Sequence, residues 1–172
     1  MYNNEGMFSK DIQKKISDLY YSLDSISIKR YYNLFYCTKR DVPPQQHIKE
    51  LECDDLKISS QYFLDYEIGA FTRVHSDNND LVKKTSITLV EANDLEGGEI
   101  IVYEPHYKSD MEVPEDGTVI NRYSGDYVPG ETIIPIVVKQ EVGETIAYGP
   151  NVLHSVSKVL KGNRVVLVTW YE

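Results

Sequence analysis

The stretch 143–172 restricts the fold most, because it reads as two β-strands with turns between them. The first strand, 145–148, is mostly apolar and ends at Gly149-Pro150, a dipeptide that marks a turn. The second strand, 164–171, is rich in valine and follows a Lys-Gly-Asn turn. Valine packs well on a pleated, half-buried surface. We therefore expect the end of the chain to lie within a β-sheet.

Short strands and turn signals recur upstream of this stretch. Alternation places Tyr62, Leu64 and Tyr66 on one face of a strand, and Gly69 then allows a bend. Pro135 cannot donate to a strand ladder, so its strand is expected at a sheet edge or a bulge. The other expected strands lie at 85–93, 99–103 and 132–140, with a turn at 93–98. Many short strands at close spacing predict a mainly β protein.

The first third of the chain is expected to support the sheet. Apolar residues recur there in steps of three and four, which predicts one amphipathic helix over 8–26. Ser9 followed by Asp11 is a helix-start signal. We expect this helix to pack on the outside of the sheet, with a dimer contact as the alternative. The tyrosine-rich segment 29–37 is either a strand or a second short helix, and the prolines at 43–44 end regular structure.

Composition excludes several classes of partner. The length of 172 residues predicts a single domain. The net charge of -9 argues against nucleic acid or an anionic membrane as a partner. Cys37 and Cys53 lack the spacing of a metal site or a disulfide framework, so we expect reduced thiols. The polar N-terminus and the absence of a long apolar run predict a cytoplasmic protein.

Three residues far apart in the sequence form a candidate metal site. His75 and Asp77 lie two positions apart, so on a strand their side chains point the same way. His154 lies near the C-terminus, after the Gly-Pro turn. Two histidines and one carboxylate can occupy one face of an octahedral iron(II) ion and leave positions open for substrate and oxygen. We therefore predict His75, Asp77 and His154 as metal ligands.

Arg164 follows the second histidine by ten positions and is a candidate anion-binding residue. A guanidinium group can hold a carboxylate through two parallel hydrogen bonds. The other histidines receive no metal role. We expect His47 to be a solvent-exposed loop residue, and His106 to be a surface residue, with a substrate contact as its alternative.

The chain resembles the iron(II)- and 2-oxoglutarate-dependent dioxygenases, most closely their prolyl 4-hydroxylase-type branch. The resemblance covers about 59–172. The matching positions, in chain order, are Tyr66-x-x-Gly69, His75-x-Asp77, the Gly-Gly-Glu at 97–99, Gly143, His154, Val159, Gly162, Arg164 and Trp170. This resemblance implies a double-stranded β-helix, the jelly-roll or cupin architecture. The core would span 59–172, with 1–58 as an N-terminal helical buttress.

The resemblance also implies a set of cofactors and roles. His75, Asp77 and His154 would hold iron(II), while Arg164 and Tyr66 would bind 2-oxoglutarate. With O2, and with ascorbate as an optional reductant, such an enzyme hydroxylates an unactivated C–H bond and releases succinate and CO2. A prolyl residue, another amino acid or a different small molecule or peptide could be the substrate.

This sequence departs from the family pattern at three places. Thr72 stands where many members have a second tyrosine. Ile87 stands, between Ser86 and Thr88, where a hydroxyl group often helps to bind the cosubstrate. Glu91 stands where tyrosine is common, so we expect it to face outward or to pair with a lysine such as Lys83 or Lys84. Trp170 resembles the family's tryptophan near the site, and core packing is its alternative role.

The segment 104–131 is long and polar, and loops at the mouth of a rigid scaffold often carry selectivity. It is expected to form part of a lid over the substrate, with Arg122 and Tyr123 as contacts, or else to be a surface excursion. Two other functions stay open for the whole chain. One is a metal-dependent isomerase or epimerase on the same fold, and the other is a non-catalytic metal-binding module. The oligomeric state is also open.

Overall fold

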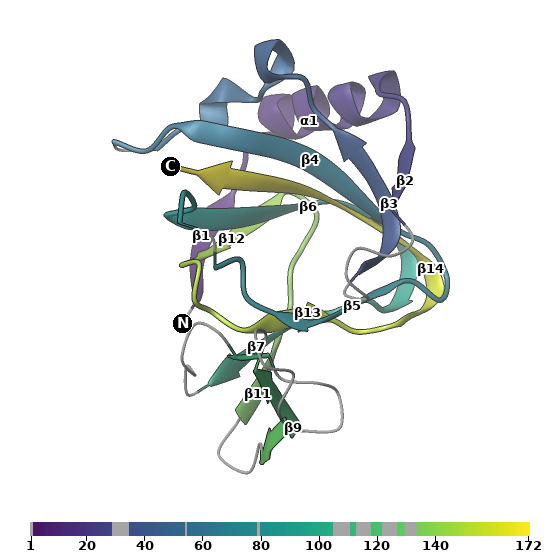
Figure 1. Cartoon of the computed structure of the whole chain (residues 1–172). Coiled ribbons are helices and arrows are strands. Elements are labelled where there is room, and N and C mark those ends of the chain that lie inside the picture. Colours follow the sequence, from purple (N-terminus) through teal and green to yellow (C-terminus); the bar gives the residue numbers. More distant parts are fainter. Residues whose placement is uncertain are drawn as a thin grey trace.

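One antiparallel sheet curls over on itself in the part of the chain that the structure describes (Figure 1). The computed structural model describes residues 2–28, 35–53, 55–78, 80–104, 111–112, 118–121, 127–129 and 134–172. The strand order is β1-β12-β6-β14-β4-β3-β5-β13-β7-β11, and β2 pairs with β3. The strands are β1 (Tyr2–Met7), β2 (Ile26–Ile28), β3 (Phe35–Asp41), β4 (Ile58–Tyr66), β5 (Phe71–His75), β6 (Lys84–Gly97), β7 (Ile100–Glu104), β11 (Ile134–Val138), β12 (Glu144–Tyr148), β13 (His154–Val156) and β14 (Val159–Tyr171).

Strand β3 is the fold line of this sheet, because it pairs with β4 on one side and with β5 on the other. A broad layer consists of β1, β12, β6, β14 and β4. A narrower layer that faces it consists of β5, β13, β7 and β11 (Figure 1). An antiparallel sheet closed in this way is a jelly roll. The predicted mainly β, double-stranded β-helix is confirmed.

The two faces of the broad layer bury different sets of residues. On β4, Tyr62, Leu64 and Tyr66 face the space between the layers, as the alternation predicted. Phe63 faces the opposite side, where it packs with Val165 and Leu167 of β14 against the N-terminal region. The interior of the jelly roll and the outer face of the broad layer are therefore separate hydrophobic cores.

Helix α1 (Lys10–Ser22) covers the outer face of the broad layer (Figure 1). Ser9 caps its N-terminus, where the Ser9 hydroxyl accepts a hydrogen bond from the amide of Ile12 at 3.3 Å. Ile16 and Tyr20 are its fully buried residues. The helical buttress is confirmed, although the predicted range 8–26 is too long at both ends.

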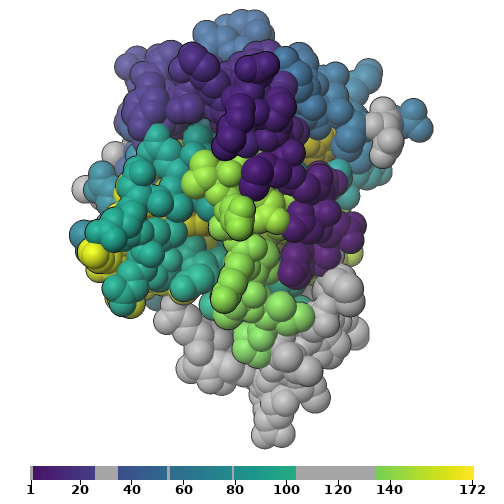
Figure 2. All heavy atoms as spheres, turned by 180° about the vertical axis from the view of Figure 1, so that it is seen from behind, coloured from purple at the N-terminus to yellow at the C-terminus, as the bar shows by residue number. Residues whose placement is uncertain are grey.

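The N-terminus adds a strand that the sequence did not predict. Strand β1 pairs antiparallel with β12, so the first residues of the chain lie beside 144–148 (Figure 2). Two short 3-10 helices, η1 (Pro44–Gln46) and η2 (Lys49–Leu51), follow β3. The break predicted at the prolines is therefore confirmed.

The predicted turn at 93–98 is wrong, because β6 continues to Gly97 and pairs with the start of β14. This pairing contains bulges and two glycines with positive φ. A Cβ at Gly97 would lie 2.1 Å from the Lys158 carbonyl oxygen, and one at Gly162 would lie 2.1 Å from that of Asn93. The strands cross so closely there that only glycine fits.

A three-stranded sheet lies beyond the narrow layer. It contains β8 (Met111–Glu112), β9 (Thr118–Asn121) and β10 (Tyr127–Pro129) in the order β10-β9-β8. The candidate lid residues Arg122 and Tyr123, and also His106, lie outside the described residues. Pro135 lies in β11, the last strand of the large sheet, so its predicted edge position is confirmed. None of the described helices is long and apolar enough to span a membrane.

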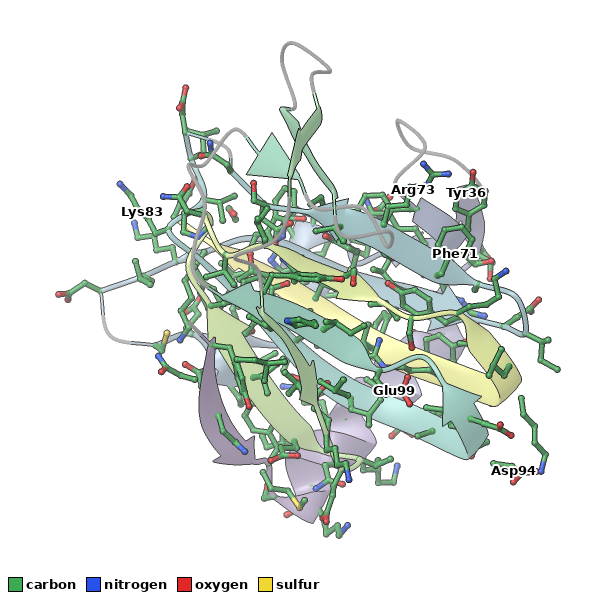
Figure 3. The ribbon with its side chains drawn as sticks, turned by 90° about the horizontal axis from the view of Figure 1, so that it is seen from below. Tyr36, Phe71, Arg73, Lys83, Asp94 and Glu99 are labelled. Carbon is green, nitrogen blue, oxygen red and sulfur yellow. The ribbon has the colours of Figure 1, made fainter. Side chains whose placement is uncertain are left out.

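Figure 3 shows the two ends of the jelly roll, with Lys83 at one end of the broad layer and Asp94 at the other. The first end, where β6 begins and β14 finishes, is called the mouth below. The second end, where β6 meets the start of β14, is called the closed end.

Candidate functional site

The jelly roll brings together the three predicted metal ligands. His75 ends β5 and His154 begins β13, and the two residues lie directly opposite each other in the antiparallel pairing. Asp77 lies just past the end of β5 rather than on the strand. One ligand atom from each residue lies within 4.8 Å of the other two. All three side chains are shielded from solvent, so the predicted triad exists as a compact, buried cluster.

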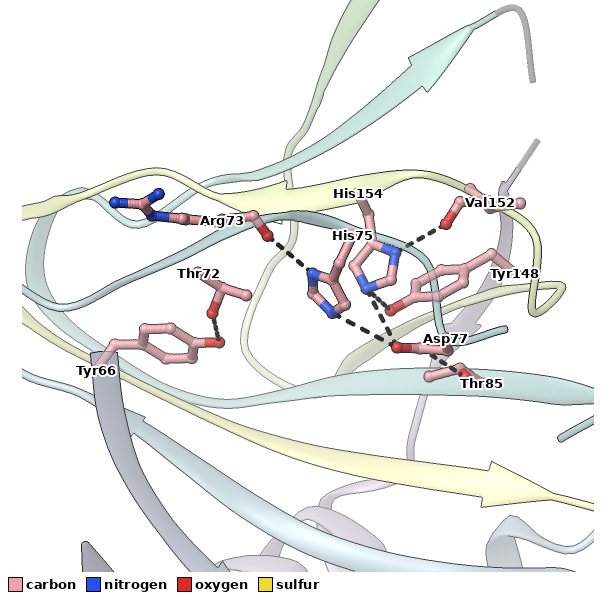
Figure 4. A network of polar contacts seen from close by, with 9 residues as sticks. All are labelled: Tyr66, Thr72, Arg73, His75, Asp77, Thr85, Tyr148, Val152 and His154. Carbon is pink, nitrogen blue, oxygen red and sulfur yellow. Dashed lines mark hydrogen bonds and ion pairs between the residues drawn. The ribbon is translucent and has the colours of Figure 1, made fainter. Parts of the chain in front are cut away.

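Backbone carbonyls fix the orientation of both imidazole rings (Figure 4). His75 Nδ1 lies 2.8 Å from the Arg73 oxygen, and His154 Nδ1 lies 3.0 Å from the Val152 oxygen. A carbonyl can only accept a hydrogen bond, so each Nδ1 carries the proton. Each Nε2 then points toward Asp77 and carries the lone pair that a metal would use, the arrangement commonly found around ligating histidines.

Asp77 is held as a carboxylate between the two rings. Its Oδ1 lies 3.5 Å from His75 Nε2 and 3.8 Å from His154 Nε2, and Thr85 Oγ1 donates a hydrogen bond to its Oδ2 at 2.9 Å. Burial opposes ionisation of Asp77, but His154, His75 and Thr85 outweigh it and hold the pKa of this carboxyl well below its usual value. The cluster therefore offers two imidazole nitrogens and one carboxylate oxygen.

Tyr148 is a site residue that the sequence reasoning missed. Its hydroxyl lies 3.0 Å from His154 Nε2, the atom that a metal would use (Figure 4). Tyr148 lies opposite Thr85 in the pairing of β12 with β6, and both residues belong to the mouth end of the inner face. Alternation along 145–148 placed Tyr148 on the same face as Ile146, but it gave no reason to pair it with His154.

Arg164 faces the interior of the jelly roll from the broad layer, at the closed end. Its side chain is buried, and its Nη2 donates to the Gln140 Oε1 at 3.3 Å. Its Nη1 is buried and has no hydrogen-bond partner among the described residues. A cavity of about 280 Å³ adjoins it. A buried cation with an unused donor next to a cavity is suited to binding an anionic group.

Tyr66 lies opposite Arg164 in the pairing of β4 with β14. The Arg164 guanidinium carbon lies 5.6 Å from the centre of the Tyr66 ring, and the Tyr66 hydroxyl is hydrogen-bonded to Thr72 Oγ1 at 2.9 Å. Burial raises the pKa of Tyr66, so it stays a neutral phenol. The structure thus brings Tyr66 beside Arg164 and places Thr72 as the hydrogen-bond partner of Tyr66.

The sequence differs from the dioxygenase pattern at two further positions, Ile87 and Glu91. Ile87 faces the jelly-roll interior. The Ser86 hydroxyl is hydrogen-bonded to the Tyr171 hydroxyl, and the Thr88 hydroxyl to that of Thr145. Glu91 faces outward, as expected, but its partners are Tyr21 of α1 and Asn93 rather than a lysine.

The prediction for His47 is wrong, because His47 is buried rather than exposed. Burial also lowers the pKa of this histidine. The prolines that precede it turn the segment back over the outer core, so a histidine in an irregular segment is covered.

No protein-family model matches the sequence, and no curated protein matches it either. Solved structures do. A 2OG-Fe(II) oxygenase family oxidoreductase from Burkholderia pseudomallei aligns with a TM-score of 0.67 and 14% identity over 96% of this chain and 79% of its own. A prolyl-4-hydroxylase from Pseudomonas putida aligns with a TM-score of 0.61 and 14% identity over 99% and 91% of the two chains.

A third similar structure is SnoK, a non-heme alpha ketoglutarate dependent carbocyclase from nogalamycin biosynthesis. It aligns with a TM-score of 0.71 and 11% identity over 99% of this chain and 79% of its own. The chain therefore has the fold of the 2OG-Fe(II) oxygenases, the prolyl-4-hydroxylases among them. The resemblance that the sequence suggested is confirmed at the level of the fold.

Proposed function

We propose that this protein is an iron(II)- and 2-oxoglutarate-dependent oxygenase that hydroxylates an unactivated C–H bond. One observation carries the proposal. Two imidazole Nε2 atoms and one carboxylate converge at the mouth, while the unpartnered Nη1 of Arg164 lies in the interior toward the closed end. A metal held by the triad and a dicarboxylate held by Arg164 would account for both features together.

The triad fits iron(II) in both charge and geometry. When bound, iron(II) and 2-oxoglutarate would supply the electrons that activate O2, and the protein would position and shield the reactants. His75 and His154 would each contribute Nε2, because their Nδ1 protons are already engaged by carbonyls. Asp77 would contribute Oδ1, with Thr85 holding its other oxygen. Three protein ligands on one side leave positions open for exchangeable ligands.

Arg164 fits the distal carboxylate of 2-oxoglutarate. Burial lowers the pKa of its guanidinium, yet an arginine stays protonated in proteins. A carboxylate on Nη1 would form a charge-assisted hydrogen bond worth about 1.5–3 kcal/mol. Gln140 holds Nη2 in place, and Tyr66 packs beside the guanidinium as a second candidate contact. The inward Val166 and Val168 separate Arg164 from the mouth and would exclude water from the cosubstrate.

Hydroxylation is supported by the retained carboxylate ligand and by the likeness to a prolyl-4-hydroxylase fold. The carbocyclase SnoK shares this fold, so the outcome of the reaction depends on the substrate that the site positions. The main substrate would be a small molecule or a peptide. Two free cysteines and a net charge of -9 support the proposal of a cytoplasmic protein that does not bind nucleic acid.

Succinate production tests the proposal directly. The purified protein, given iron(II), 2-oxoglutarate and O2, should form succinate, and candidate substrates should gain one oxygen by mass. His75→Ala, Asp77→Ala and His154→Ala should each abolish succinate formation, because each removes a ligand. Lys14→Met, on the exposed face of α1, is the matched control. Metal binding without succinate would instead favour a binding module or a metal-dependent isomerase.

A further inference from the structure

A second cavity, of about 270 Å³, lies toward the mouth of the jelly roll. Three strands contribute its walls, namely β3, β4 and β14. Its lining residues are Phe35, Cys37, Lys39, Ser60, Tyr62, Leu64 and Trp170. Odd-numbered residues of β3 and even-numbered residues of β4 and β14 face it, so it is a feature of the inner face of the jelly roll.

This cavity, called the mouth pocket below, is connected to the triad through two of its lining residues. The ring of Phe35 lies edge-on to the His75 ring, with their centres 5.1 Å apart. Trp170 lies opposite Thr85 in the pairing of β14 with β6, and Thr85 holds Asp77. The pocket is therefore linked to His75 through Phe35, and to Asp77 through Trp170 and Thr85.

The walls of the mouth pocket are mostly aromatic. Tyr62 and Trp170 meet edge to face, with ring centres 5.9 Å apart and planes at 81°. Phe35 and Leu64 complete the apolar surface. Such walls favour an apolar or ring-shaped body, because burying apolar surface is worth roughly 25 cal/mol per Å².

One charged side chain lines the mouth pocket. It is that of Lys39, whose Nζ lies 4.5 Å from the centre of the Tyr62 ring. An ammonium group needs hydrogen-bond acceptors, so the pocket favours a ligand with anionic oxygens.

Asp41 is the present partner of Lys39, at 2.9 Å. The Asp41 side chain is 53% exposed, whereas that of Lys39 is 26% exposed. An exposed ion pair is weak, because water and salt screen it. Asp41 can therefore turn toward solvent and leave the Lys39 ammonium to a ligand.

We propose that the mouth pocket binds the main substrate, and that this substrate is a small carboxylic acid with an apolar, ring-containing body. Its carboxylate would lie at Lys39, and its body would lie between Tyr62 and Trp170. The Phe35 wall would direct one of its carbons toward the metal ligands. This proposal adds a substrate class to the proposed oxygenase function. Only the reaction of the bound molecule rests on that function, because binding depends on the pocket.

Trp170 provides a direct readout, because it is the single tryptophan of the chain. Cyclohexanecarboxylate is a suitable probe, and cyclohexanecarboxamide is its uncharged match of nearly the same shape. Titration of the metal-free protein with the acid should change the Trp170 fluorescence in a saturable way. The amide should bind about ten-fold more weakly, since it cannot form the charge-assisted contact with Lys39.

Four variants locate the anion. Lys39→Met should lower the affinity for the acid by about ten-fold and leave the amide unchanged, whereas Lys39→Arg should retain acid binding. Asp41→Asn should tighten acid binding, because it removes the competing carboxylate. Arg164→Met should leave the Trp170 response intact, because Arg164 lies at the other end of the inner face.

Three outcomes would overturn the mouth pocket assignment. These are equal affinity for acid and amide, an unchanged acid affinity in Lys39→Met, and loss of the response in Arg164→Met alone. The test is separable from that of the proposed function. A Lys39-dependent response without succinate formation would retain the pocket and reject the oxygenase, and succinate formation without that response would do the reverse.

Discussion

The Tyr148 hydroxyl competes for the atom of His154 that a metal would use. Because His154 Nδ1 carries the proton, Nε2 accepts a hydrogen bond from this hydroxyl at 3.0 Å. Metal binding must break that bond, which is worth about 1 kcal/mol. Tyr148→Phe should therefore raise the affinity for cobalt(II) about five-fold in a calorimetric titration. Tyr36→Phe, on the outer surface, is the control. Weaker binding in Tyr148→Phe would show instead that the hydroxyl helps to hold the metal or its ligands.

The two thiols should differ in reactivity by a large factor. Burial raises the pKa of Cys37 to about 12, whereas Cys53 is only half-buried and accepts a hydrogen bond from Lys84 Nζ at 3.4 Å. A raised pKa keeps the thiol protonated at pH 8, and the thiolate is the reactive form. In the folded protein a disulfide reagent should modify Cys53 rapidly and Cys37 slowly. Cys53→Ser should remove the rapid phase, and its persistence there would contradict the assignment.

The glycines of the sheet differ in how well they should tolerate alanine, because some lie where two strands cross closely. Gly97 has φ of 77° and no room for a Cβ, Gly69 has φ of 87° in open space, and Gly149 has open space without a positive φ. Gly69→Ala should destabilise the fold by about 1–2 kcal/mol from backbone strain alone. Gly97→Ala should cost about 3 kcal/mol or more, because its Cβ also meets a backbone carbonyl.

Urea denaturation of the three glycine variants separates these contributions. Gly149→Ala should lie near wild type and serves as the control. An equal loss in Gly97→Ala and Gly69→Ala would show that the β6–β14 crossing can relax to admit a methyl group.

Individual strands and the residues on them could be predicted from the sequence, because alternation and turn signals are local. The inward faces of Tyr62, Leu64 and Tyr66 and the edge position of Pro135 are examples. Pairing between distant strands could not be predicted. The β1–β12 pairing, the bulged β6–β14 crossing and the burial of His47 all depend on long-range packing.

Some residues of the candidate site could be predicted from the sequence, and others could not. The order and spacing of His75, Asp77, His154 and Arg164 pointed to a metal and an anion, and the fold brings the three metal ligands together. Tyr148 was not predicted, because its contact with the site depends on where the chain turns between β12 and β13. The mouth pocket was not predicted either, since it needs β3, β4 and β14 side by side.

Binding of metal and cosubstrate should stabilise the whole molecule in two separable steps. A ligand that binds only the folded state at 100 times its Kd stabilises it by about 2.7 kcal/mol. Zinc(II), as an inert substitute for iron(II), should raise the Tm of the wild type, and 2-oxoglutarate should raise it further only when the metal is present. In Arg164→Met, the metal should still raise the Tm as in the wild type. The further rise in Tm from 2-oxoglutarate should be mostly lost, because this variant lacks the donor for the distal carboxylate.

In His154→Ala, neither the metal nor 2-oxoglutarate should raise the Tm, since both effects depend on the triad. Arg164→Lys should retain part of the rise from 2-oxoglutarate, because it keeps the charge without the two-pronged geometry. Scanning calorimetry at matched ligand concentrations measures all three variants. An undiminished 2-oxoglutarate increment in Arg164→Met would show that another residue holds the distal carboxylate, even though Arg164 is buried with an unused donor on the inner face of the jelly roll.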